Sequence, residues 1–198
     1  GECTIDGKPL KMSSNHFPTI DPKRPNVLSK GEEELLEKLR NSFRLSEKLH
    51  RHIRIQLNHG CMYSVYNNNL LLPLNEDGSL KEVEIYPGRK YKGKELMHNI
   101  GIMIRTAFQS DSDAKERRYA IDYFLYLWLG KDSPLFDKAK MTTFERYFFK
   151  DKAIYHEEKG VYFKLRDNEE VVDRILDAFD VKGTNRHIIN GHVPVHVV

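Results

Sequence analysis

The sequence has 198 residues, of which 39% are hydrophobic and 31% are charged, with a net charge of +3. A chain of this size can bury a core of its own, and no apolar run approaches the roughly 20 residues of a membrane span. Acids and bases are mixed along the chain, which argues against nucleic acid or a membrane as a partner. Two cysteines are too few for a disulfide framework or a structural zinc site. With no signal peptide at its start, the chain is expected in the reducing cytoplasm.

The first predicted helix follows a stretch without helical periodicity. Residues 1–28 hold four of the eight prolines and are predicted to be an extended connector. Ser29 and Glu32 then form a capping-box pattern. Apolar residues at three- and four-residue steps predict one long helix to about residue 58. A basic cluster at 48–54 on this helix is either a phosphate-binding patch or a solvated face near the helix end.

Short strands are predicted next. Gly60 is expected to end the helix as a left-handed cap. Two apolar runs, 62–66 and 69–72, are joined by a pair of asparagines and predict a hairpin. Residues 80–86 alternate as a strand, and the basic segment 87–94 is predicted to be an exposed loop because it lacks the spacing of a phosphate-binding loop.

The second half of the chain is predicted to be mainly helical. Apolar residues at helical spacing place helices at 94–109, 113–129 and 168–180. A second capping-box pattern, from Thr142 to Glu145, predicts a short helix. Its inward-facing residues are expected to be Phe144, Phe148 and Phe149. Residues 155–164 are polar and then strand-like.

Residues 187–195 contain a candidate metal ligand, His192. Ile188 and Ile189 run into Asn190-Gly191-His192, and a proline follows at 194. This pattern predicts a buried strand at 187–195 whose end presents the His192 imidazole in a loop. Histidine is a common metal ligand. A lone histidine after a strand is also often a hydrogen-bonding loop residue, and spacing alone leaves both interpretations open.

Several long segments closely resemble the class III, or Firmicutes-type, fructose-1,6-bisphosphatases, in order and over nearly the whole chain. The segments are 46–52, 126–130, 133–136, 140–148 and 187–195. The resemblance implies the α/β class, α+β in appearance, with a partial αβ-sandwich of the metallophosphatase type. The strands expected at 61–72, 80–86 and 187–195 would form part of one mixed sheet with flanking helices. Residues 1–198 would be the carboxy-terminal part of a single catalytic domain, with 1–28 as its connector and 29–198 in the sandwich.

The same resemblance implies a two-metal site, usually used with manganese (Mn²⁺), and a sugar bisphosphate as substrate. By its match to a Gly-His-x-Pro motif, His192 is implied to be a metal ligand. The family's early ligand motifs do not occur in this sequence, and about four residues that carry another ligand are missing before Pro73. Arg146, Lys140 and Lys138 are candidates to hold the second phosphate of the substrate; surface charges at a helix start are an equal alternative. A homo-oligomer is expected.

Two hypotheses follow from these residues. In the first, the chain is a fragment of a gluconeogenic bisphosphatase that converts fructose 1,6-bisphosphate to fructose 6-phosphate by a two-metal mechanism. The fragment alone would be inactive, because it offers one convincing ligand where about seven are needed. In the second, it is a non-catalytic structural or regulatory domain derived from the same fold. The absence of an initial Met and the strand-like end make us expect a piece of a longer protein.

Overall fold

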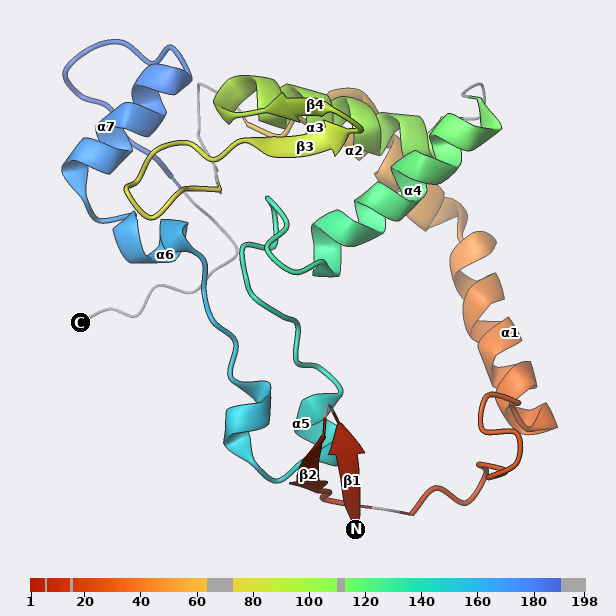
Figure 1. Ribbon diagram of the computed structural model, residues 1–198. Coiled ribbons are helices and arrows are strands. Elements are labelled where there is room, and N and C mark those ends of the chain that lie inside the picture. Colours follow the sequence, from red (N-terminus) through yellow and green to blue (C-terminus); the bar gives the residue numbers. More distant parts are fainter. Residues whose placement is uncertain (6, 15, 64–72, 110–112, 190–198) are drawn as a thin grey trace. The chain divides into compact units, whose positions relative to one another are not determined.

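The computed structural model, drawn in Figure 1, describes residues 1–5, 7–14, 16–63, 73–109 and 113–189. The chain divides into two units, each built from two separate segments. The first unit comprises Gly1–Gly60 with Thr142–His156, and the second comprises Cys61–Met141 with Glu157–Val198. Within the described residues, no helix is both long and apolar enough to cross a membrane.

A β-hairpin opens the first unit. β1 (Glu2–Ile5) and β2 (Lys8–Lys11) pair antiparallel, with Cys3 opposite Leu10. Beyond β2, Met12 forms an antiparallel bridge with Phe149, and the Ser13 N–H donates to the Phe148 carbonyl at 2.7 Å. The segment expected to be extended therefore contains a hairpin that is joined to a distant part of the sequence.

Two helices follow, where one was predicted. α1 (Lys30–Arg44) begins with the expected capping box, in which the Ser29 N–H donates to the Glu32 carboxylate at 2.7 Å. It ends before Ser46, whose hydroxyl accepts from the backbone of α2 (Glu47–His59). The single helix was wrong because a serine side chain offers the backbone an alternative to continued helix bonding. Gly60 ends α2 with φ −75°, so the predicted left-handed cap was also wrong.

The core of the second unit packs around three helices, α3 (Gly93–Phe108), α4 (Ala114–Leu129) and α7 (Glu169–Ala178). Figure 1 shows α3 and α4 as neighbours. All three lie within about two residues of their predicted spans. Two have side-chain caps: Asp113 accepts from the start of α4, and Asn168 from the start of α7. Their buried apolar residues include Leu96, Met97, Ile100, Met103, Ala120, Leu127, Val171 and Ile175.

A second hairpin lies against α3 in the second unit (Figure 1). β3 (Val83–Tyr86) pairs with β4 (Arg89–Tyr91), and Gly88 adopts φ +74° between them. The loop predicted for residues 87–94 was therefore wrong, because proline and glycine here form a tight turn rather than an open loop. The Tyr119 hydroxyl on α4 donates to the Ile85 carbonyl at 2.6 Å and fastens the hairpin to that helix.

The remaining short elements differ most from expectation. α5 (Glu145–Phe148) has Phe144, not Thr142, at its N-cap position and has no side-chain cap. The Thr142 hydroxyl donates to the Tyr155 carbonyl at 3.2 Å. Phe149 is buried, whereas Phe144 is 73% exposed and does not pack inward as predicted. η1 (Lys152–Tyr155) precedes the stretch expected to be polar and then strand-like at 155–164, and α6 (Val161–Leu165) takes the place of its strand-like part.

In the described residues the sheets are two-stranded, β1–β2 and β3–β4. This mixture of small antiparallel sheets and flanking helices agrees with an α+β appearance. Most of the hairpin predicted at 62–72 and of the strand predicted at 187–195 lies outside the described residues, and 187–189 are not in a strand. The metallophosphatase sandwich and the single catalytic domain therefore stay predictions.

Candidate functional site

The four residues singled out from the sequence fall into three places. Arg146 belongs to the first unit, and Lys138 and Lys140 belong to the second. His192 lies outside the described residues. The two described locations are therefore considered separately.

Arg146 is held in a defined position within the first unit. Its Nε donates to the Thr142 carbonyl oxygen at 3.2 Å, and its guanidinium lies 5.7 Å from the centre of the Tyr155 ring. Thr142 is itself fully buried and donates through its hydroxyl to the Tyr155 carbonyl at 3.2 Å. Since an arginine that is bonded through Nε and lies over an aromatic ring has less freedom to rotate, this geometry suits bidentate binding of a phosphate.

Lys138 is already engaged by an acid in the second unit. Its Nζ lies 2.9 Å from the Glu157 carboxylate and 5.6 Å from the centre of the Phe136 ring. An antiparallel bridge between Lys138 and Lys159 holds the two segments together. A phosphate at this position would have to compete with Glu157 for the ammonium group. Lys140 is exposed two residues further along the chain.

A neighbouring carboxylate, Asp137, was not identified from the sequence. It packs against Gly160, where a side chain of any size would overlap the carboxylate. The Gly160 N–H donates to the Asp137 carbonyl at 2.7 Å. Burial raises the pKa of Asp137; Lys81 opposes this rise and Asp132 adds to it. Its Oδ2 is buried without a hydrogen-bond partner among the described residues.

One local feature of Asp137 was open to sequence reasoning. Asp137 has φ +45°, and aspartate tolerates the left-handed region better than most residues. The sequence does not show that this turn meets Gly160, because that contact joins segments more than twenty residues apart. The carboxylate is therefore a product of non-local packing.

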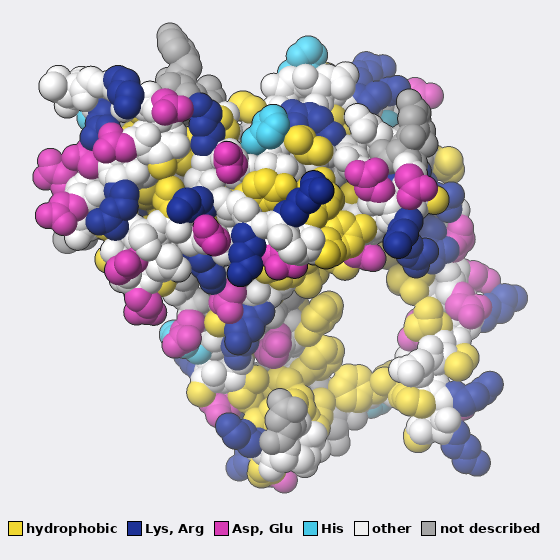
Figure 2. All heavy atoms as spheres, turned by 45° about the horizontal axis from the view of Figure 1, so that its top comes forward, with side chains coloured by type: hydrophobic (Ala, Val, Ile, Leu, Met, Phe, Trp, Pro, Cys, Tyr) yellow, Lys and Arg dark blue, Asp and Glu magenta, His cyan; other side chains and the backbone are white. Residues whose placement is uncertain are grey.

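Metal-ligating side chains do not gather in the part of the chain that the structure describes. No group of three or more His, Cys, Asp or Glu residues is arranged there to hold an ion. The basic cluster at 48–54 is mostly exposed on α2, and the His50 ring nitrogen lies 2.9 Å from the Arg44 carbonyl oxygen. Figure 2 shows acidic and basic side chains interspersed over the face drawn. That face therefore carries no broad field of one sign.

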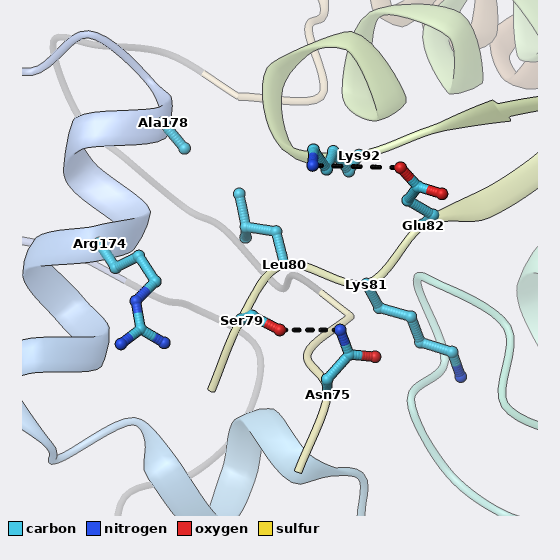
Figure 3. A pocket seen from close by; sticks show the side chains of 8 residues that line it. All are labelled: Asn75, Ser79, Leu80, Lys81, Glu82, Lys92, Arg174 and Ala178. Carbon is cyan, nitrogen blue, oxygen red and sulfur yellow. Dashed lines mark hydrogen bonds and ion pairs between the residues drawn. The ribbon is translucent and has the colours of Figure 1, made fainter. Parts of the chain in front are cut away.

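The second unit also has an open pocket of about 660 Å³, shown in Figure 3. Lys92 lies 4.0 Å from the Glu82 carboxylate, and Arg174 donates to the Asp77 carbonyl at 3.2 Å. Lys81 and Arg174 lie on either side of Leu80 in Figure 3. A small-molecule site needs a few polar groups that converge on one point. The cations of this pocket do not converge in that way.

Comparison with known proteins gives the family of the chain. The model of the Firmicute fructose-1,6-bisphosphatase family matches residues 1–198. The chain belongs to this family. A fructose-1,6-bisphosphatase class 3 of Phocaeicola vulgatus is 51% identical over 197 residues, and the match covers 98% of this chain. Proteins of the same description from Bacteroides fragilis and Alkaliphilus metalliredigens are 50% and 46% identical.

The chain spans less than a third of each of these relatives. The shares are 29% of the Phocaeicola protein and 30% of the other two. No solved structure matches the chain. The resemblance stated from the sequence is confirmed at the level of the family.

Proposed function

We propose that this chain is a portion of a fructose-1,6-bisphosphatase that removes the 1-phosphate of fructose 1,6-bisphosphate and yields fructose 6-phosphate. The family match over residues 1–198, together with about half identity to curated class 3 enzymes, is the observation that carries the proposal. The enzyme would serve gluconeogenesis in the cytoplasm. Within it, this chain would supply substrate contacts and one end of the active site.

Arg146 is the described residue best suited to the substrate. Its guanidinium would bind the phosphate that is not hydrolysed and would fix the sugar relative to the reacting phosphate. Because Thr142 and Tyr155 already hold this side chain, little conformational entropy would be lost on binding. Lys138 would contribute only if the substrate displaced Glu157, which makes it the weaker candidate.

The described residues do not fit a two-metal site, since no set of donors gathers among them. The metals, manganese in our proposal, would therefore be held largely by residues outside the described part, His192 among them. When bound, such ions supply an activated water and neutralise phosphate oxygens. The sequence contains one match to the family's ligand motifs, so we propose that the chain alone does not turn over substrate.

Phosphate release from fructose 1,6-bisphosphate, measured with millimolar manganese, tests the proposal. We expect no turnover by this chain and turnover by a version extended through the missing ligand motifs. In the extended version, Arg146→Lys should raise KM about tenfold, with a small effect on kcat, because lysine cannot reproduce the bidentate contact.

A matched control and two contrary outcomes complete this test. Arg118→Lys, an exposed position on α4, should leave both kinetic constants unchanged. Turnover by the short chain that His192→Ala abolishes would show that the active site is more complete than proposed. Silence from both versions would instead support the non-catalytic domain.

A further inference from the structure

Thr142 carries a fully buried hydroxyl next to the candidate phosphate-binding residue, Arg146. Its neighbour in the sequence, Thr143, is exposed. A buried hydroxyl is costly unless it forms hydrogen bonds. The Thr142 hydroxyl forms two: it donates to the Tyr155 carbonyl at 3.2 Å and accepts from Arg146 Nε at 3.4 Å. The same hydroxyl therefore joins the arginine to the segment that carries Tyr155.

Arg146, Thr142 and Tyr155 form a closed set of contacts, which we call the Arg146 cluster. Arg146 Nε also donates to the Thr142 carbonyl oxygen at 3.2 Å, and the guanidinium carbon lies 5.7 Å from the centre of the Tyr155 ring. Each of the three residues thus contacts the other two. Arg146 itself is exposed at the surface, so an anion can approach it.

The backbone around the Arg146 cluster is held by further contacts. α5, which carries Arg146, lies against η1, which carries Tyr155. A side-chain cap closes the start of η1, and Met12 forms a bridge with Phe149 between the two elements. None of these contacts involves the Thr142 hydroxyl. Removal of that hydroxyl should therefore change the orientation of the arginine more than the path of the chain.

We propose that Thr142 is a positioning residue for the substrate and acts through Arg146. This inference rests on the proposed function, in which Arg146 binds the phosphate that is not hydrolysed. Thr142 accepts the Nε hydrogen, and the Tyr155 ring limits rotation of the guanidinium plane. A planar fork binds two phosphate oxygens only when its plane is aimed at them. Substrate affinity then depends on a hydroxyl that does not touch the substrate.

The hydroxyl of Thr142 and the ring of Tyr155 contribute in ways that substitutions can separate. A hydroxyl donates and accepts at the same time, whereas a valine of the same shape does neither. A serine at position 142 keeps both bonds. The Tyr155 ring acts through its face, which phenylalanine reproduces and leucine does not.

Steady-state kinetics of the extended version on fructose 1,6-bisphosphate tests the proposal. Thr142→Val should raise KM about fivefold with little change in kcat, because one hydrogen bond to a charged side chain is lost. Thr142→Ser should keep the KM of the wild type. Tyr155→Leu should raise KM and Tyr155→Phe should not. The dissociation constant of fructose 6-phosphate, measured by competition, should change in parallel with KM.

A double variant decides whether Thr142 acts through Arg146. In an Arg146→Lys background, Thr142→Val should change KM by less than about twofold, because lysine has no Nε hydrogen for Thr142 to accept. Thr143→Val makes the same substitution at the exposed neighbouring residue and is the matched control. It should leave KM and kcat unchanged.

The contrary outcomes distinguish this inference from the proposed function. An active extended version whose KM is unchanged by Thr142→Val overturns the inference alone. A rise in KM that persists in the Arg146→Lys background also overturns it, because Thr142 would then act on the fold and not on the arginine. If Thr142→Val does not fold, an equal KM for Tyr155→Leu and Tyr155→Phe overturns the inference. Silence of the extended version overturns the proposed function and the inference with it.

Discussion

The charged side chains of two adjacent residues, Asp137 and Lys138, differ in whether they have a partner. The Lys138 ammonium is matched by Glu157 at 2.9 Å, whereas one oxygen of the Asp137 carboxylate is buried without a described partner. Burial penalises the ionised form of Asp137 and raises its pKa, and Lys81 offsets only part of that effect. Asp137 therefore weakens the second unit whenever it is ionised.

Replacement of the Asp137 carboxylate should show how much it lowers the stability of the second unit at each pH. The pKa of Asp137 is higher in the folded than in the unfolded state, so its destabilising effect is full above the folded pKa and disappears as pH falls through it. We expect Asp137→Asn to stabilise the second unit at pH 7, and this gain to shrink in acid. Asparagine also tolerates φ +45°.

Urea denaturation at a series of pH values measures this difference. Asp122→Asn, which makes the same change of charge at an exposed position on α4, is the control. If Asp137→Asn lowers stability at pH 7, the attraction between Lys81 and Asp137 outweighs the cost of burial.

At the scale of elements, local signals predicted the helices well and the short pieces poorly. α3, α4 and α7 combine a long apolar stripe with helical spacing, and Asp113 and Asn168 cap two of them. Ser46 interrupted the first predicted helix, although its capping chemistry can be recognised in the sequence. The capping pattern from Thr142 to Glu145 failed because the helix has Phe144 at its N-cap position, and the Thr142 hydroxyl bonds to the distant Tyr155 carbonyl. A short capping motif does not form its local hydrogen bonds when its side chain bonds to a distant part of the chain.

The phenylalanines around α5 should differ sharply in their contribution to stability. Phe149 is only 9% exposed, so Phe149→Ala should destabilise the first unit by roughly 3 kcal/mol. Phe144 is 73% exposed, and Phe144→Ala should change the free energy of unfolding by less than about 0.5 kcal/mol. Phe148 is half-buried and its ring is tilted against that of Phe17, with 5.8 Å between ring centres, so the loss on its replacement should lie between these two.

Circular dichroism during chemical denaturation provides the comparison. Equal losses at positions 144 and 149 would mean that the burial pattern of this segment differs from the one described.

At the scale of the whole molecule, the chain is organised by pairings between distant segments. Residues 11–13 of the opening segment bond to residues 148–150, and both belong to the first unit. Sequence patterns predicted an extended segment at the start of the chain, but non-local pairing leaves no local periodicity to detect. The same reason applies to the candidate site: Arg146 could be proposed from the chemistry of its side chain, whereas Asp137 and its contact with Gly160 could not.

Removal of residues 1–14 tests the pairing between this segment and residues 148–150. The Lys150 N–H donates to the Lys11 carbonyl at 3.3 Å, so hydrogen–deuterium exchange at Lys150 should accelerate in the truncated chain. Amides within α3, in the second unit, should keep their protection and serve as the internal control. Unchanged exchange at Lys150 would show that the opening hairpin does not hold this segment.

The division of the first unit between two segments also affects its synthesis on the ribosome. The opening hairpin can form early, but its partner at residues 148–150 is made more than 130 residues later. At about 5–20 residues per second this interval lasts roughly 7–30 seconds. During that time the nascent chain displays an unsatisfied strand edge, a period in which a chaperone would have most effect.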